Sequence, residues 1–328
     1  MLHFRIDDIV DAICATGAIR HDDATAFMQR ELLNVRQQAI LVERPELRGT
    51  FFVPPASEQG NLGATHSTYQ QEDFAGKAAL GATMSTNPPR VDVSREEATP
   101  LPYRHIELAY GWSIKEIRSS IMAGRSLDVS RATNCQKVIA VRHDDIILIG
   151  DGTADYLGLT GIFKLSGTLT YTLPNGAQSG TKVWEDKSAK EIYADMMAIC
   201  NYVRTNSNGV EVPNMLALPL TSWTVAATKT WGVDSTETAL DRFLKAAGKI
   251  YPGIMVEPCE KLETAGSGNT KRFAAYRRDN EKVWRDDLVM FEQAPPIVAG
   301  FQTTVNCHAE TAGVRAAKPK SICYADGG

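Results

Sequence analysis

Three neighbouring titratable residues are of the types that bind metal ions. His143, Asp144 and Asp145 offer one imidazole and two carboxylates, which are common ligands of zinc and of other divalent metals. The surrounding pattern is helical, however, and successive residues of a helix point about 100° apart, so three neighbours cannot converge on one ion. We interpret them as charged residues of a final helical turn and predict no metal site there.

A second candidate for metal chemistry follows directly in the sequence. Asp151, Thr153 and Asp155 have the spacing of the first ligands of a calcium-binding loop. Such a loop also needs a glycine at its sixth position and a closing bidentate glutamate, and neither residue stands in its place. We therefore predict no calcium site.

The motifs of common catalytic sites are absent from the sequence. It contains no phosphate-binding Gly-x-x-x-x-Gly-Lys-Ser/Thr, no His-Glu-x-x-His and no Gly-x-Ser-x-Gly. Cys135 and Cys200 fall on apolar stripes at helical spacing, which favours core positions over nucleophiles. We predict a protein that is not an enzyme, with no catalytic residues, no cofactor-binding residues and no metal.

Composition excludes several other classes. The formal net charge of −4 does not favour a protein that holds nucleic acid by neutralising phosphates. The six cysteines form no Cys-x-x-Cys pair, so we expect reduced thiols and neither a zinc knuckle nor a disulfide framework. No apolar run approaches the ~20 residues of a membrane span, and the N-terminus is too acidic for a signal peptide. We expect a soluble protein made in the cytoplasm, with about two domains from its 328 residues.

The elements that would position any site are arranged around residues 113–164. Ser113 and Glu116 have the spacing of a capping box, which predicts a helix to about Ala123 and a break at Gly124. A longer helix should begin at residue 126 or 128, continue to residue 149 and stop at Gly150. Its buried stripe is predicted from five residues at helical spacing, widened by two valines: Ala132, Cys135, Ile139, Ile146 and Ile149, with Val138 and Val141.

The chain before this pair of helices divides into two parts. Residues 6–14 and 22–45 show helical stripes, which predict either paired helices that cover each other or an arm that packs on a neighbour. Residues 49–111 are rich in proline and glycine, and strand-like alternation appears at Val91 and Val93 and again over residues 104–110. We predict a long hairpin that leaves near Thr65 and returns near Tyr110. A hairpin folded back on its own domain is the alternative to an arm.

The chain after these helices indicates an α/β unit. We predict two strands joined by a turn at residues 174–176, a helix capped by Ser188 and Glu191, and a buried strand over residues 213–220. Two helices follow, over residues 221–231 and from a cap at Asp234 or Ser235. Residues 254–256 and 273–276 are expected to be further strands.

The order and spacing of residues from the helical region to the C-terminus resemble those of the major capsid proteins of tailed bacteriophages, a fold that encapsulin shell proteins share. The first group of matching residues is Ala123, Gly124, Leu127, Asp128, Asp144, Asp145, Gly150, Asp151, Gly158, Leu159, Gly161 and Ile162. The second group is Pro295, Gly300, Val305, Gly313, Val314, Pro319, Ile322 and Tyr324. The resemblance covers roughly residues 69–328.

This resemblance implies an α+β fold, the tailed-phage major capsid fold. Its expected parts are an N-terminal arm over residues 1–64 and an extended β-hairpin loop over residues 65–112. A peripheral domain with the long spine helix would take residues 113–165 and 291–328, and an α/β axial domain residues 166–290. Lys77 in the hairpin loop could join a covalent cross-link, as in some relatives, although a solvated lysine is the favoured interpretation.

The implied function is a shell protein that assembles with itself into the pentamers and hexamers of an icosahedral phage head. That head would enclose double-stranded DNA without sequence-specific binding, would be assembled in the host cytoplasm and would involve no membrane. Portal, scaffolding and decoration proteins are candidate partners by the same resemblance. Two alternatives stay open: an encapsulin-like compartment shell, and a cytosolic α/β enzyme with an unrecognised site.

Overall fold

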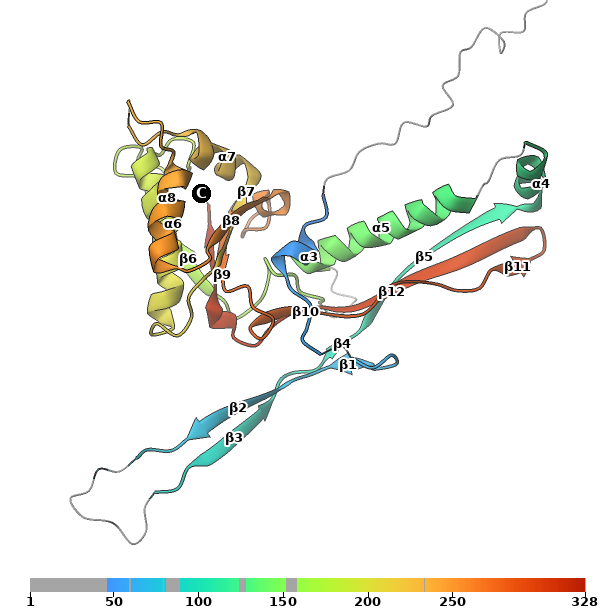
Figure 1. Cartoon of the computed structure of the whole chain (residues 1–328), viewed down its shortest axis with the longest axis horizontal. Helices are drawn as coiled ribbons and strands as arrows, with labels where there is room; N and C mark the ends of the chain where they lie inside the picture. The colour runs from blue at the N-terminus through green and yellow to red at the C-terminus, as the bar shows by residue number, and fades with distance from the viewer. Residues whose placement is uncertain are drawn as a thin grey trace, which may run out of the picture. The chain divides into compact units, whose positions relative to one another are not determined.

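The structure is a computed structural model, and it describes residues 46–58, 60–78, 80, 89–123, 128–151, 158–232 and 234–327. The chain divides into two compact units, residues 1–46 and 47–328. Figure 1 shows the elements of the second unit. The two N-terminal helices, and with them the choice between arm and paired helices, lie outside the described residues.

The second unit contains a five-stranded mixed sheet in the order β6-β13-β9-β7-β8. Strand β13 is parallel to β6 and antiparallel to β9, while β7 is antiparallel to β9 and parallel to β8. The strands are β6 (Leu169–Thr172), β7 (Met215–Pro219), β8 (Met255–Cys259), β9 (Arg272–Tyr276) and β13 (Ile322–Asp326). All five residues of β7 are buried, as the apolar run predicted.

Both faces of this sheet are covered, because alternate residues of each strand point to opposite sides. On one face Leu216 and Phe273 pack with α6 (Ala189–Asn206) and α8 (Ala239–Ile250). On the other face the neighbouring residues, such as Ala217 and Ala274, join a second core with Phe52, Ile147 and Ile162. A shift of register by one residue in any of these strands would disturb both cores.

A second sheet has β12 (Gln302–Ala316) at its centre. Strand β5 (Arg104–Ser113) pairs with one edge of β12, and β10 (Val283–Gln293) and β11 (Ile297–Ala299) pair with the other. Helix α5 (Asp128–Leu148) packs on one face of this sheet through a small core. That core contains Trp112, Cys135, Ile139, Val305, Cys307 and Ala309.

The predicted helices around α5 are confirmed. Helix α4 (Ile114–Ala123) begins with the expected capping box, in which Glu116 accepts from the Ser113 backbone N–H at 2.9 Å and the Ser113 hydroxyl accepts from the Glu116 N–H at 3.3 Å. Helix α5 ends one residue before the predicted end, and Gly150 has a φ of +88°. An L side chain rarely adopts that φ. The short helix α3 (Gly49–Phe52) contacts the C-terminal part of α5.

The predicted stripe of α5 is partly right. Cys135, Ile139 and Ile146 are buried, but the prediction that Val138 widens the stripe is wrong, because its side chain is 40% exposed. Val138 lies one position from Ile139, so its side chain points about 100° away from the core face.

Two further predictions are wrong. The turn at residues 174–176 leads to no second strand, since residues 177–188 form turns. This segment is held to α6 by Trp184 and Lys187, which both donate to Asp195. Helix α8 is capped by Thr238, whose hydroxyl accepts from the Asp241 N–H at 3.1 Å, and not by residue 234 or 235. The capping motif there ends in aspartate, which lies outside the Glu/Gln form of the motif.

The remaining predicted elements are present in the described chain. Helix α6 has the expected Ser188–Glu191 capping box, and α7 (Leu220–Thr228) follows β7. Short 3₁₀ turns occupy Glu260–Glu263 and Pro319–Ser321. Strand β10 begins before the predicted domain limit at residue 291, and β13, from the segment expected in the peripheral domain, pairs with β6 and β9. The domain division itself stays a prediction.

Candidate assembly surfaces

A two-stranded hairpin extends the chain between α3 and β5. Strand β2 (Gln70–Ala75) pairs with β3 (Asp92–Glu97) in an antiparallel register from Gln70–Glu97 to Ala75–Asp92. At its base β1 (His66–Ser67) pairs with β4 (Leu101–Pro102). A hairpin is therefore present as predicted and begins near Thr65, but its pairing ends at Pro102 and not near Tyr110, because β5 pairs with β12. Its tip at residues 81–88 lies outside the described residues.

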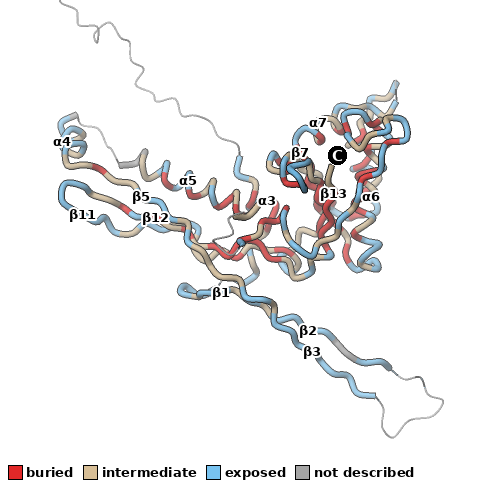
Figure 2. Tube along the Cα trace, turned by 180° about the vertical axis from the view of Figure 1, so that it is seen from behind, coloured by how far each residue is buried: buried red, intermediate tan, exposed pale blue. Residues whose placement is uncertain are grey.

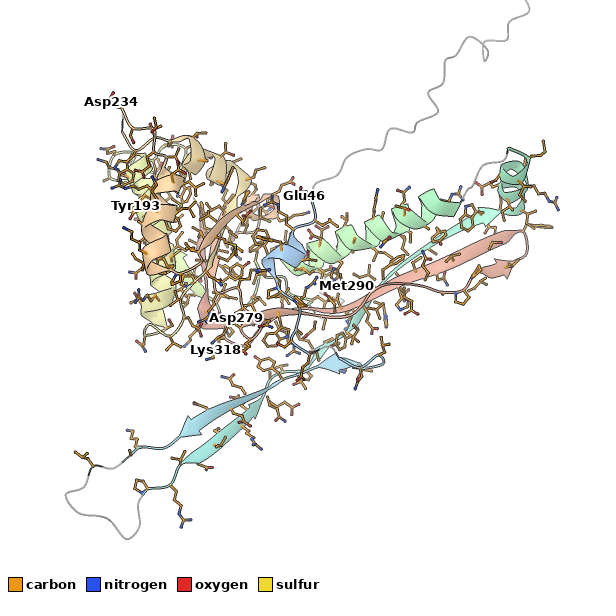
Figure 3. The ribbon with its side chains drawn as sticks, in the orientation of Figure 1. Glu46, Tyr193, Asp234, Asp279, Met290 and Lys318 are labelled. Atoms are coloured by element: carbon orange, nitrogen blue, oxygen red, sulfur yellow. The ribbon has the colours of Figure 1, made fainter. Side chains whose placement is uncertain are left out.

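The hairpin strands have no apolar face to bury. Every residue of β3 is exposed (Figure 2), and side chains project from both sides of the ribbon (Figure 3). Strands β2 and β3 together carry five carboxylates and one arginine, Arg95, which pairs across the strands with Glu72 at 2.8 Å. An exposed pair of this kind contributes little to stability. Because an isolated two-stranded ribbon is at best marginally stable in water, this hairpin is the first candidate for a surface that needs a partner.

A second candidate surface lies at the end of the second sheet, where α4 begins beside the turn between β11 and β12. The Ile114 N–H donates to the Phe301 carbonyl at 2.9 Å, which links the start of α4 to the turn between β11 and β12. Large apolar side chains are exposed on both elements: Ile121 75%, Met122 93%, Ile297 53%, Val298 70% and Phe301 81%. Exposed apolar side chains of this size at one end of the second sheet make α4 and β11 a candidate interaction surface.

The three candidate metal ligands at the end of α5 each bind a different partner. His143 Nε2 lies 2.7 Å from Asp287 Oδ1, and Asp144 Oδ1 accepts from the Gly49 N–H at 2.5 Å. Asp145 pairs with Lys261 at 2.7 Å. Burial raises the pKa of Asp144, against the opposing effect of the hydrogen bond from Gly49. These side chains therefore fasten α5 to β10, α3 and the 3₁₀ turn after β8.

The other residues singled out in the sequence are also placed. Asp151 pairs with Arg142 at 3.2 Å, while Thr153 and Asp155 lie outside the described residues. Cys135 and Cys200 are buried core residues, as predicted, and burial raises the pKa of Cys135 to about 11. Lys77 is exposed.

The described part of the chain offers neither a metal-binding cluster nor a membrane-spanning helix. It contains no group of three or more His, Cys, Asp or Glu side chains that could hold a metal ion. None of its helices is both long enough and apolar enough to span a membrane.

A family model described as "Major capsid protein" matches residues 76–327, which is more than half of the chain. The chain belongs to the major capsid protein family. Membership gives it a structural role in a viral capsid, confirms the resemblance stated from the sequence, and favours a capsid over an encapsulin-like compartment. A comparison with curated proteins found no significant match.

Solved capsid structures share the fold. The capsid of Myoviridae phage XM1 superposes with a TM-score of 0.75 at 15% identity, covering 92% of this chain and 98% of that chain. The capsid of a native GTA particle gives a TM-score of 0.56 at 12% identity, and the match covers 91% of this chain and 96% of that chain. The structure from Gordonia phage Cozz gives a TM-score of 0.55 at 11% identity, and the match covers 99% of this chain and 98% of that chain. The expected α+β capsid fold is confirmed.

The sequence analysis missed a group of residues at the base of the hairpin. Asp286 on β10 and Arg315 on β12 are both buried, at 7% and 5% exposure, and both contact Ser67. The available signal was Arg315 itself, a charged residue within the largely apolar run AGVRAA. A charge in such a run indicates a buried partner.

Proposed function

We propose that this capsid protein assembles with copies of itself into pentamers and hexamers that close an icosahedral phage head around double-stranded DNA. Head-to-tail contacts between identical subunits form closed rings when the rotation fits. A chain that tolerates two slightly different rotations can form both kinds of ring. We further propose the division into arm, hairpin loop, peripheral domain and axial domain given above.

The observation that carries this proposal is the exposed hairpin of β2 and β3. Its strands pair with each other, its β3 side chains are all exposed, and its surface is mainly acidic. A ribbon with these properties gains stability when it lies on another subunit, where its polar side chains and strand edges find partners. The exposed apolar residues of α4 and β11 provide a second surface for the same assembly.

The charge of the chain agrees with a container for DNA rather than a sequence-specific DNA-binding protein. A net charge of −4 supplies no excess of Lys and Arg to neutralise phosphates. We accordingly propose a non-enzymatic role in the virion, with assembly in the host cytoplasm. Portal, scaffolding and decoration proteins are proposed as further partners.

The test is assembly of the full-length chain with and without the hairpin. The Ala98 N–H donates to the Tyr69 carbonyl at 3.0 Å, so the two strands are adjacent there and residues 70–97 can be replaced by an Asn-Gly turn. We expect closed particles from the unaltered chain in negative-stain microscopy, and a folded subunit without closed particles from the shortened chain.

Two results would contradict the proposal. Normal shells from the shortened chain would remove the role given to the hairpin. An unaltered chain that stays at subunit size at every concentration would oppose assembly itself. Nuclease-protected DNA in particles from infected cells is the expected content, whereas an enzyme held inside by a cargo peptide would indicate a compartment.

A further inference from the structure

An oppositely charged pair is buried where the hairpin joins the second sheet. Arg315 Nε on β12 lies 3.4 Å from Asp286 Oδ2 on β10, and the two side chains are 5% and 8% exposed. The regular pairing of β10 with β12 is interrupted between Arg285 and Asp287. A bulge of this kind re-aims the side chain at its centre, and Asp286 contacts the hairpin.

Arg315 contacts both ends of the hairpin at its base. Its Nη2 donates to the backbone carbonyl of Ser67 in β1. It also donates to the carbonyl of Thr99, in the link between β3 and β4, at 3.3 Å. Asp286 Oδ2 accepts from the Ser67 hydroxyl at 2.7 Å. One buried ion pair thus holds the two ends of the hairpin together and to the sheet.

Two aromatic rings complete the contact. The Tyr69 ring meets the Trp284 ring edge to face at 5.3 Å between centroids, and the Arg315 guanidinium lies 5.7 Å from the Tyr69 centroid. Trp284 Nε1 donates to Asp286 Oδ1 at 3.0 Å. Burial raises the pKa of Asp286 and lowers that of Arg315.

We propose that Asp286 and Arg315 form a clamp that fixes the direction in which the hairpin leaves the sheet, and that closed shells require this clamp. The inference rests on the proposed function, since it assigns the positioning residues of the proposed assembly hairpin. A buried ion pair is a poor source of net stability, but it can select one geometry among several. That is the property a long arm requires.

The length of the hairpin gives the clamp its importance. From Ser67 to Lys77 an extended strand of ten residues reaches about 33 Å at ~3.3 Å per residue. A rotation of about 10° at the base would displace Lys77 by about 6 Å, more than the ~4.8 Å between paired strands. A loosened base would therefore move the arm off its partner surface while the subunit stays folded.

The principal test removes both charges together, because removing one would leave the other buried without a partner. The double variant is Asp286→Asn with Arg315→Met. The matched control is Asp326→Asn with Arg272→Met, which removes another Arg–Asp pair, at 2.7 Å in the five-stranded sheet. Arg272 also donates to the Phe163 carbonyl and Asp326 accepts from the Ser267 N–H, and neither of these partners lies in the hairpin.

The direct measurement is the distance distribution between spin labels on the full-length subunit. In a Cys14→Ser background, labels are placed at the exposed positions Ser94→Cys on β3 and Glu107→Cys on β5. We expect the distribution to be at least twofold broader in the clamp variant than in the control. We also expect at least tenfold fewer closed particles from the clamp variant by negative-stain microscopy.

The outcomes separate this inference from the proposed function. Equal widths of the spin-label distance distribution and equal particle yields in the clamp and control variants would overturn the proposed clamp. A broadened distance distribution together with normal shells would also overturn it. If the unaltered chain forms no shells, the proposed function fails. The width of the spin-label distance distribution still tests whether Asp286 and Arg315 fix the direction of the hairpin. If the clamp variant does not fold, Ser67→Ala replaces it; an unchanged width in that variant would overturn the proposal.

Discussion

Ile139 offers a quantitative test of how α5 is held on its sheet. Its side chain is 2% exposed and belongs to a small core with Trp112, Cys135 and Val305. Ile139→Ala removes three carbons, which accounts for about 2.4 kcal/mol at ~0.8 kcal/mol each, and the cavity adds to this. We expect a loss of about 3 kcal/mol in the free energy of unfolding. Ile139→Val should cost about 1 kcal/mol.

The matched control is the neighbouring residue, Val138. Its side chain is 40% exposed, so Val138→Ala removes little buried surface and improves helix propensity. We expect a change within about 0.5 kcal/mol. Ile139→Asp, which would place an unpaired carboxylate in the same core, should prevent folding of the α5 region.

The assay is urea unfolding of the dissociated subunit, followed by circular dichroism and by amide hydrogen exchange of α5 peptides. Amide hydrogen exchange measures the local stability of α5 even if the whole chain does not unfold in one step. Equal losses for Ile139→Ala and Val138→Ala, or normal protection of α5 in Ile139→Asp, would show that this face of the helix is not buried and would refute the reasoning.

Three further predictions concern other parts of the chain. Lys187→Met leaves Asp195 buried without its 2.6 Å partner and should lower the free energy of unfolding by about 3 kcal/mol. Adding Asp195→Leu should restore much of this loss. Equal stabilities of the single and double variants in urea unfolding would contradict the prediction. Burial raises the pKa of the Cys200 thiol, so peptide mapping should find it unmodified by a thiol reagent at pH 8 until urea is added, and rapid labelling of the folded chain would count against its burial. The Arg131 guanidinium and the Ser113 N–H lower the pKa of Glu116 to about 2, so the stabilisation from its ionised form is present above pH 4.5 and lost as the pH falls through about 2. A carbon-13 NMR titration of Glu116 should show this midpoint, and Arg131→Gln should move the midpoint upward. A midpoint near 4.5 in the unaltered chain would contradict the prediction.

Local sequence signals predicted the elements whose stabilising contacts are close in sequence. The capping boxes at Ser113 and Ser188 concern residues three apart, and both are present in the described chain. The buried strand β7 was predicted for a similar reason, because a continuous apolar run can be covered on both faces.

The errors occurred where distant residues decide the structure. The chain after residue 176 was predicted to form a strand, but Lys187 binds Asp195 of α6 and the Pro174 carbonyl, so the segment packs on a helix and does not pair as a strand. The clamp at the hairpin base joins Ser67 to Arg315, which are 248 positions apart. The apolar run around Arg315 indicates that it has a buried partner, but no short-range pattern identifies that partner as Ser67.

The place of β13 in the five-stranded sheet has a consequence for synthesis. Strand β6 has β13 as its neighbour in the sheet order, and β13 also closes the outer edge of β9, yet Ile322–Asp326 leaves the ribosome after all the other strands in that sheet. Until then β6 and β9 present open strand edges to the solvent. A polypeptide released early would lack a finished sheet and would be prone to aggregation and degradation. We therefore expect chains that lack β13 to be lost before they can assemble.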